Sequence, residues 1–401
     1  MRGVDRCYQA KGMIRLDKRY LVLLAGMLVT FVLGSVHAYS VFLVPLEASL
    51  NLPRSQISLI YSWALVAITI SVLLGYRIYA RWPAWLLIGL TCVIAAMGLY
   101  LAALADAWWQ LFVGYSLMFG LANGIGYGFS LQLVGRVLPQ RKGFAMGAVT
   151  ASYALGSILF AKIFAWRIES LAVDAALLAL MHAVLGFGLI AALILLITRA
   201  DYGESDDPSG VRGQRRKVVQ FWLAYMSSVF SGLMAIGHAA GIVLWKELDS
   251  EQSTLGAMMI GAGSALGGFL AGWMIDRWPV TRFLVGLPLL ASVALLLLNP
   301  AEGGLLVIGL LSIVGFSYGA IIAVYPVAIS NFFADAGPRV YGQVFTAWGF
   351  AGLVAPWTAG LIFDWYGGYT PALIVAAVIA SLSALAAAVC RFEPIAKGVA
   401  D

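Results

Sequence analysis

The stretch RADYGESDDPSGVRGQRRK, residues 199–217, divides this chain of 401 residues close to its midpoint. Its polar composition, with Gly and Pro, is typical of a flexible linker. Long apolar runs lie on both sides of it, and the chain as a whole is 62% hydrophobic and only 11% charged. Soluble domains carry about 25% charged residues. The sequence therefore predicts a membrane protein. The net charge of +6 is scattered between apolar runs, which disfavours nucleic acid as a partner.

Six apolar runs precede this linker and six follow it, each long enough to cross a bilayer core as one helix. They are residues 20–44, 55–79, 84–105, 108–135, 143–166, 172–198, 218–245, 253–275, 281–299, 303–333, 339–363 and 370–390. The runs are continuous and not alternating, which favours helices over barrel strands. We predict an all-α membrane protein whose twelve transmembrane helices form two pseudo-symmetric six-helix bundles. The bundles are residues 1–198 and 218–401, joined by a cytoplasmic linker at 199–217.

The distribution of basic residues predicts the orientation. With the N-terminus inside, the inner segments hold 21 of the 25 Lys and Arg residues, while the acidic residues divide almost evenly between the two sides. This is the asymmetry that the positive-inside rule describes. The four basic residues that fall outside are Arg54, Lys162, Arg167 and Lys246. We expect a multi-pass protein of the cytoplasmic membrane with both termini in the cytoplasm.

A weak internal repeat supports the division into halves. The tripeptide Arg-Trp-Pro occurs at 81–83 and again at 277–279, about half the chain apart. Two similar bundles that face each other place a substrate cavity at their interface. The glycine-rich stretches 120–128 and 261–268 lie inside apolar runs, so they are not phosphate loops. Small residues let membrane helices approach and slide, and we expect these stretches at a moving interface between the bundles.

Gly272-x-x-x-Asp276-Arg277 lies between the second and third spans of the second half. It is similar to the loop signature of the major facilitator superfamily, and the whole chain resembles that superfamily. In the resembling proteins the acidic residue and the Arg form a conformational latch on the cytoplasmic side, so the resemblance implies this role for Asp276 and Arg277. The first half has Ala80 before Arg81 and lacks the carboxylate.

Two further stretches resemble a narrower group, the monocarboxylate and oxalate/formate transporters. They are GSVHAYSVFLVPL at 34–46 and PQRKGFAMG at 139–147, with Tyr153 and Gly156 following. The resemblance implies alternating-access transport of a small organic acid. The sequence departs from these families at three positions. It has Gly268 where the families carry a substrate-binding Arg, Ser264 where they carry an acidic neighbour, and Trp348 where the oxalate transporters carry a Lys. Both fixed cations are missing.

His37 is the best candidate for replacing that charge. Ionisable groups deep in a membrane are costly and default to functional hypotheses. An imidazole can take up a proton and then hold a carboxylate. By resemblance, His37 also falls where animal monocarboxylate transporters carry a cationic Lys that couples proton to substrate. His238, in the equivalent helix of the other half, could face it across the cavity.

The remaining substrate-binding candidates are aromatic and amide residues. One is Tyr39, two residues past His37, and the resemblance places the others near family substrate positions: Asn123, Tyr127, Tyr318, Phe345 and Trp348. Aromatic rings can enclose a flat anion or an apolar tail, and Tyr hydroxyls donate hydrogen bonds. The three His and three Cys residues are far apart and show no ligand spacing, so we expect no metal and no cofactor.

The sequence therefore predicts a secondary active transporter of a small, monocarboxylate-like organic acid, driven by a proton taken up at His37. Its partners would be that substrate, the proton and the lipid bilayer, and we expect a monomer. The alternative is a transporter or exporter of a neutral or amphipathic small molecule, which the missing cations favour. No catalytic motif supports an enzyme.

Overall fold

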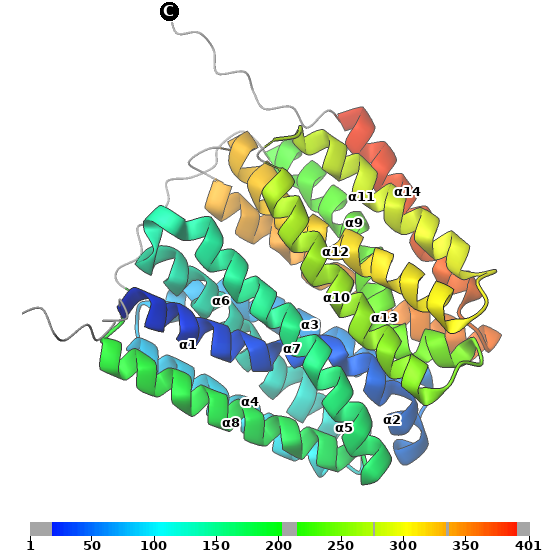
Figure 1. Cartoon of the computed structure of the whole chain (residues 1–401), viewed down its shortest axis with the longest axis horizontal. Helices are drawn as coiled ribbons and strands as arrows, with labels where there is room; N and C mark the ends of the chain where they lie inside the picture. The colour runs from blue at the N-terminus through cyan, green and yellow to red at the C-terminus, as the bar shows by residue number, and fades with distance from the viewer. Residues whose placement is uncertain (1–17, 203–214, 276, 334–336, 391–401) are drawn as a thin grey trace, which may run out of the picture.

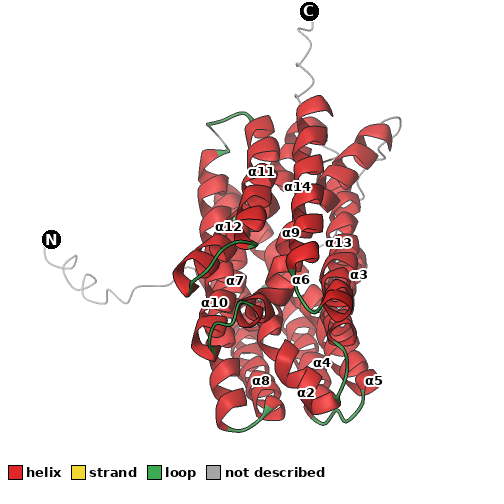
Figure 2. Cartoon of the chain, turned by 90° about the vertical axis from the view of Figure 1, so that its right-hand side faces the viewer, coloured by secondary structure: helices red, strands yellow, loops and turns green. Residues whose placement is uncertain are grey.

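The computed structural model describes residues 18–202, 215–275, 277–333 and 337–390, and every regular element in these ranges is helical (Figure 2). Twelve segments in them are long and apolar enough to cross a membrane. This number and the absence of strands from the described residues confirm the predicted fold class. The uninterrupted apolar runs decide it, because only a helix satisfies its own backbone polar groups in lipid.

The first six spans form one group, drawn from blue to green in the lower left of Figure 1. Its elements are α1 (Lys18–Leu33), η1 (Gly34–Phe42), α2 (Leu43–Leu50), α3 (Arg54–Tyr79), α4 (Ala84–Ala103), α5 (Trp108–Leu111), η2 (Phe112–Phe119), α6 (Gly120–Val137), η3 (Pro139–Arg141), α7 (Lys142–Ser170) and α8 (Val173–Thr198). Within the group, α1 packs against α6, α7 and α8, while α4 packs against α8.

The last six spans form the second group, drawn from green to red in the upper right of Figure 1. They are α9 (Arg215–Trp245), α10 (Ser250–Met274), α11 (Val280–Leu298), α12 (Gly304–Phe333), α13 (Gly337–Tyr366) and α14 (Thr370–Cys390). The two groups meet chiefly where α3 packs on α13, α7 packs on α10, and η1 packs on α9. These three contacts between the groups position the candidate site.

Consecutive spans alternate in direction, so the structure has two faces. Lys18 begins the first span, Thr198 ends the sixth and Arg215 begins the seventh, and we call their side the linker face. The opposite side, where α2 and α13 end and α3 begins, is the distal face. Most of the predicted linker lies outside the described residues. Its first part is held against α6, since Arg136 Nη1 donates to the Tyr202 carbonyl at 2.8 Å.

The first span is not one continuous α-helix. Its central part, η1, is a 3₁₀-helix of nine residues, which is long for this type of helix. Beside η1, the backbone of α7 crosses that of the first span so closely that no Cβ fits between them. A Cβ at Gly34 would lie 1.8 Å from the Tyr153 carbonyl oxygen, and a Cβ at Gly156 would lie 1.7 Å from the Phe31 carbonyl oxygen. Only glycine permits this crossing, which brings the η1 backbone and α7 together.

The glycine-rich stretch of α10 forms a similar crossing with α12. A Cβ at Gly263 would lie 2.1 Å from the Ser312 carbonyl oxygen, and a Cβ at Gly319 would lie 1.9 Å from that of Ser264. In the first half, Gly124 of α6 meets Ile68 of α3 in the same way. These three glycines therefore join helices of the same half, and the expected place between the bundles is wrong for them. It holds for Gly261 of the α10 stretch, where a Cβ would lie 2.8 Å from Ser157 Oγ of α7 in the other half.

Candidate functional site

His37 lies in η1, near the middle of the first span, and faces the interior between the two halves. Four aromatic rings surround its imidazole. Their centroids lie 5.6 Å away for Tyr153 of α7, 6.3 Å for Tyr61 of α3, 6.4 Å for Tyr318 of α12 and 6.5 Å for Trp348 of α13. All four stand nearly perpendicular to the imidazole. We call these five residues the His37 cage, and each half supplies two of the four surrounding rings.

The cage holds its polar atoms in fixed pairs. His37 Nδ1 lies 2.8 Å from the Tyr61 hydroxyl, and Trp348 Nε1 donates to the Tyr318 hydroxyl at 2.8 Å. Among the described residues, His37 Nε2 has no hydrogen-bond partner, and none of the groups that contact the ring carries a charge. His37 is partly exposed, whereas Tyr61 is fully buried. The imidazole is therefore oriented through one nitrogen and leaves the other available.

Asn123 of α6 connects the start of η1 to Tyr153 of the cage through two hydrogen bonds. Its Nδ2 donates to the Leu33 carbonyl at 2.7 Å, where α1 gives way to η1, and its Oδ1 accepts from the Tyr153 hydroxyl at 3.0 Å. The amide is fully buried, so these bonds hold the start of η1 and the Tyr153 ring in register. The Tyr127 ring lies 5.0 Å from that of Tyr153 and forms a second layer.

Two further aromatic candidates support the cage from outside. Tyr39 is buried, and its hydroxyl donates to the Ile57 carbonyl at 2.8 Å, while its ring stacks on Tyr61 at 5.4 Å and 12°. Phe345 stacks on Trp348 at 5.3 Å and 11°. Stacking of this kind fixes the planes of Tyr61 and Trp348, so these residues act on the cage through its members.

His238 occupies a different place, nearer the distal end of α9. It is fully buried. Its Nδ1 lies 2.8 Å from the Tyr369 hydroxyl, and its Nε2 lies 2.8 Å from the Pro356 carbonyl oxygen and 3.2 Å from Ser58 Oγ. Both nitrogens are thus engaged. The structure brings His37 together with Tyr318 and Trp348, but it does not pair the two histidines.

Arg54, at the start of α3, extends this second cluster across the boundary between the halves. It forms an ion pair with Glu47, donates from Nη1 to the Tyr369 hydroxyl at 3.1 Å, and places Cζ 3.7 Å from the Phe363 ring centroid. The Asp364 carboxylate of α13 accepts from the backbone N of Arg54 at 3.0 Å and from that of Ser55 at 2.9 Å. A carboxylate from one half therefore caps a helix of the other.

We call Glu47, Arg54, Asp364, Tyr369, His238 and Ser58 the distal network. Arg54 is 7% exposed and Tyr369 is fully buried, so the two halves enclose the distal network. Burial raises the pKa of the Tyr369 hydroxyl above its ordinary value, although Arg54 pulls it down. Tyr369 therefore keeps its proton and can donate it.

Of the predicted latch on the linker face, the structure describes Arg277. Asp276 lies outside the described residues. Arg277 is exposed, donates from Nη1 to the Trp273 carbonyl of its own half at 3.3 Å, and places Cζ 4.1 Å from the Trp273 ring centroid. In the described chain, the polar closure between the halves lies at the distal face.

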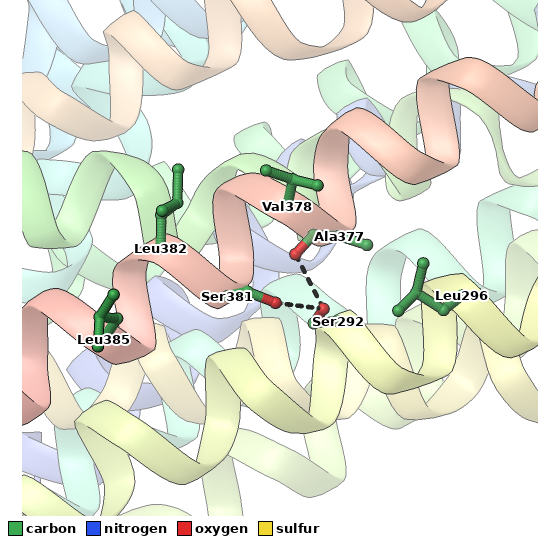
Figure 3. Close-up of a pocket in the computed structure, with 7 residues that line it drawn as sticks. All are labelled: Ser292, Leu296, Ala377, Val378, Ser381, Leu382 and Leu385. Carbon is green, nitrogen blue, oxygen red and sulfur yellow. Dashed lines mark hydrogen bonds between the residues drawn. The ribbon is translucent and has the colours of Figure 1, made fainter.

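A separate groove of about 200 Å³ lies between α11 and α14 (Figure 3). Its lining is Ser292, Leu296, Ala377, Val378, Ser381, Leu382 and Leu385. The Ser292 hydroxyl donates to the Ala377 carbonyl at 2.8 Å and lies 2.8 Å from the Ser381 hydroxyl. The two polar groups are thus satisfied, and the groove shares no residue with the cage or the distal network.

Sequence reasoning did not include Tyr61 and Tyr153 among the binding candidates, nor Arg54, Asp364 and Tyr369 as a group. Partial signals existed. Tyr153 follows the 139–147 stretch, and Arg54 is one of only four basic residues outside the inner segments. Side-chain partners between spans that are distant in sequence could not be inferred from spacing.

Comparison with known proteins identifies the class to which this fold and site belong. The sequence profile of the Major Facilitator Superfamily matches residues 22–356. The chain belongs to this superfamily of membrane transporters, as its two six-span groups indicate.

Its relatives include transporters of organic acids. The chain is 25% identical over 343 residues to the uncharacterized MFS-type transporter YhjX of Escherichia coli (82% of this chain, 85% of the relative). It is 24% identical to monocarboxylate transporter 13 of Rattus norvegicus (86% and 82%) and 24% identical to the oxalate:formate antiporter of Oxalobacter formigenes (92% and 90%).

Solved structures share the fold at low sequence identity. A bacterial homolog of the human lysosomal transporter Spinster matches with a TM-score of 0.71 at 15% identity, over 93% of this chain and 96% of that one. The xylose transporter XylE from E. coli matches with a TM-score of 0.70 at 13% identity, over 92% and 98%. These structures show the fold, while membership of the superfamily and the twelve candidate spans make the chain an integral multi-pass membrane protein that transports a small molecule.

Proposed function

We propose that this protein transports a small monocarboxylate together with a proton, and that His37 binds both. The observation that carries this proposal is the single titratable ring at the centre of an uncharged aromatic cage built from both halves. Similarity to monocarboxylate transporter 13 and the oxalate:formate antiporter supports the substrate class. The proton would supply the positive charge that Gly268 and Trp348 do not provide.

The geometry gives each nitrogen of His37 a separate task. The Tyr61 hydroxyl, 2.8 Å from Nδ1, keeps the ring oriented. Protonation makes both nitrogens donors, so Nε2 can donate to a substrate carboxylate. This bond is charge-assisted and about twice as strong as a neutral one. The aromatic faces of Tyr318 and Trp348 would contact the apolar part of the acid.

Coupling follows from the charge balance of the cage. The empty cage with neutral His37 has no charge, and the cage with a proton and a carboxylate also has none. A cage with only one of the two carries an uncompensated charge, which is costly to enclose away from water. The halves would therefore close over the empty or the fully loaded cage, and a ligand shifts that equilibrium only by its differential affinity.

Orientation belongs to the same proposal. The linker face would be cytoplasmic, in keeping with the distribution of Lys and Arg, and the protein would reside in the inner membrane. The distal face, which the distal network closes, would then be the outer face.

The experiment compares two histidine variants in proteoliposomes. L-lactate is the probe, and an imposed proton gradient is the driving force. We expect His37→Gln to abolish gradient-driven accumulation, because Gln keeps a hydrogen-bonding group but does not titrate. His182→Gln is the matched control: His182 is exposed on α8, and within the described part of the chain its ring forms one hydrogen bond, from Nδ1 to the Leu178 carbonyl of its own helix at 2.7 Å. Accumulation by His37→Gln at the wild-type level would overturn the proposal.

A neutral or amphipathic substrate is the second candidate. The flat stack of Phe345 on Trp348 and the lack of a fixed cation at Gly268 favour it. A thermal-shift screen separates the two: stabilisation by neutral aromatic compounds, and not by monocarboxylates at low pH, would support this candidate.

A further inference from the structure

Three residues of the distal network, Arg54, Tyr369 and His238, form one series of hydrogen bonds that ends at the Pro356 carbonyl, and the direction of each bond is fixed. A guanidinium only donates, so Arg54 Nη1 donates to the Tyr369 hydroxyl at 3.1 Å. A carbonyl only accepts, so His238 Nε2 donates to the Pro356 oxygen at 2.8 Å. His238 Nδ1 then accepts from the Tyr369 hydroxyl at 2.8 Å. This series of hydrogen bonds assigns His238 as a neutral ring protonated on Nε2.

Ser58 supports the same tautomer independently. Its single hydroxyl proton is donated to the Arg54 carbonyl at 2.7 Å. At 3.2 Å from His238 Nε2, Ser58 Oγ can therefore act only as an acceptor. Two acceptors face Nε2, and one donor faces Nδ1. Both ring nitrogens therefore have a suitable hydrogen-bond partner when the imidazole carries one proton, on Nε2.

A second proton on His238 has no acceptor in this series of hydrogen bonds. It would sit on Nδ1 and point at the Tyr369 oxygen, which already accepts from Arg54. The Tyr369 hydrogen would lose its acceptor, and an imidazolium would stand one hydroxyl group away from a guanidinium. Buried polar groups without partners are costly, and like charges at short range add to that cost. The Arg54–Tyr369 bond, which joins the two halves, is the contact that this proton would break.

Other charged groups near the ring come from several elements. On the first half they are Arg54 of α3 and Glu47 of α2, and on the second half they are Asp364 of α13 and Tyr369. Side chains that face neighbouring positions of α9 are uncharged: Tyr61 of α3 beside Gly237, Leu43 of α2 beside Gly241, Ser253 of α10 bonded to the Ala240 carbonyl, and Tyr318 of α12 beside Gly232. Glu47 is paired with Arg54, and Asp364 caps α3, so neither carboxylate contacts the imidazole.

We propose that His238 is a proton-binding residue that controls the distal face. Neutral His238 completes the series of hydrogen bonds from Arg54 to Pro356 and holds the halves together there. Protonated His238 releases Arg54 from Tyr369 and lets the halves separate at that face. This function goes beyond the proposed role of His37, since His238 would respond to protons without binding substrate.

The experiment measures separation of the halves at the distal face as a function of pH. Spin labels are placed at Ser170→Cys, at the end of α7, and at Ser250→Cys, at the start of α10, in the full chain without its native cysteines. Both serines are exposed and belong to different halves. Double electron–electron resonance in lipid nanodiscs compares pH 8 with pH 5, without substrate. We expect the share of the longer distance at pH 5 to be at least about three-fold its share at pH 8.

Two variants decide the assignment. His238→Gln keeps Glu47 and Asp364, so loss of the pH response in this variant assigns the response to His238. His37→Gln should still show the pH response at the distal face, which separates this proposal from failure of the proposed function. A wild-type distance that is the same at both pH values would overturn the proposal. So would a pH response that persists in His238→Gln.

Tyr369→Phe provides an independent test if His238→Gln does not fold. It removes only the hydroxyl shared by Arg54 and His238. We expect the longer distance to be populated already at pH 8, and the pH response to be reduced. A distance distribution identical to wild type at both pH values would show that the series of hydrogen bonds does not hold the distal face closed.

Discussion

A single methyl group at Gly156 tests the crossing that brings α7 against α1, just before η1 begins. An ideal Cβ there would lie 1.7 Å from the Phe31 carbonyl oxygen, and real Cβ atoms essentially never approach within 3.0 Å. The helices would have to separate by roughly 1.3 Å at this point, since a backbone carbonyl cannot rotate away as a side chain can. Overpacking lowers the free energy of unfolding by about 1–3 kcal/mol. We expect Gly156→Ala to lower it by about 3 kcal/mol, the upper end of that range.

The assay is thermal unfolding of the purified protein in detergent, with Gly147→Ala as the matched control. Gly147 lies in the same helix, but a Cβ there would meet nothing within 4 Å. Alanine favours a helix by up to about 1 kcal/mol relative to glycine, so the control should be as stable as wild type or slightly more stable. At about 2 °C per kcal/mol for a chain of this size, we expect Gly156→Ala to unfold roughly 6 °C lower.

The same variant should also impair transport, because the crossing places the Tyr153 ring 5.6 Å from that of His37. A displacement of about 1 Å near a binding site is enough to weaken it strongly. If Gly156→Ala unfolds at the temperature of Gly147→Ala and keeps wild-type uptake, the close crossing of α1 and α7 is not what positions the cage.

Two further predictions concern the cage and the topology. Tyr61→Phe removes the hydroxyl 2.8 Å from His37 Nδ1, and the loss of about 1 kcal/mol of binding free energy should raise the KM for L-lactate about five-fold. The control is Tyr115→Phe, which removes a buried hydroxyl that has no partner in the described chain and should change the KM less than about two-fold. Equal effects of the two variants would contradict the role of Tyr61. A membrane-impermeant maleimide should label Ser49→Cys on the distal face of intact cells, but Arg81→Cys on the linker face only after permeabilisation; the reverse pattern would invert the proposed orientation.

Much of the fold could be predicted because a bilayer imposes a length. Runs of about 20 apolar residues can only be helices, so the twelve spans were evident from hydropathy. The break in the first span was not. Hydropathy predicted one run at 20–44, whereas the structure has α1, η1 and α2 in succession. The 3₁₀ segment lies beside the α7 crossing, a tertiary contact that local composition does not report.

The candidate site was predicted less completely. His37, Tyr318 and Trp348 were selected from the sequence, and the structure brings them together. Tyr61 and Tyr153 complete the cage but were not selected for it, since hydropathy treats a tyrosine that faces the interior like one that faces lipid. The predicted latch of Asp276 and Arg277 stays a prediction, because Asp276 lies outside the described residues, while the described polar contacts between the halves lie on the distal face.

The sequence by itself determined the number of membrane spans and the scarcity of buried charge, because both follow from the cost of exposing polar groups to lipid. Tertiary structure alone decided which side chains meet. Arg54 and Tyr369 are 315 residues apart in the chain, and their hydrogen bond exists only because the two halves close against each other. The same applies to the aromatic rings around His37. Contacts between helices depend on rotation about each helix axis and on the depth at which each crossing occurs, and composition fixes neither.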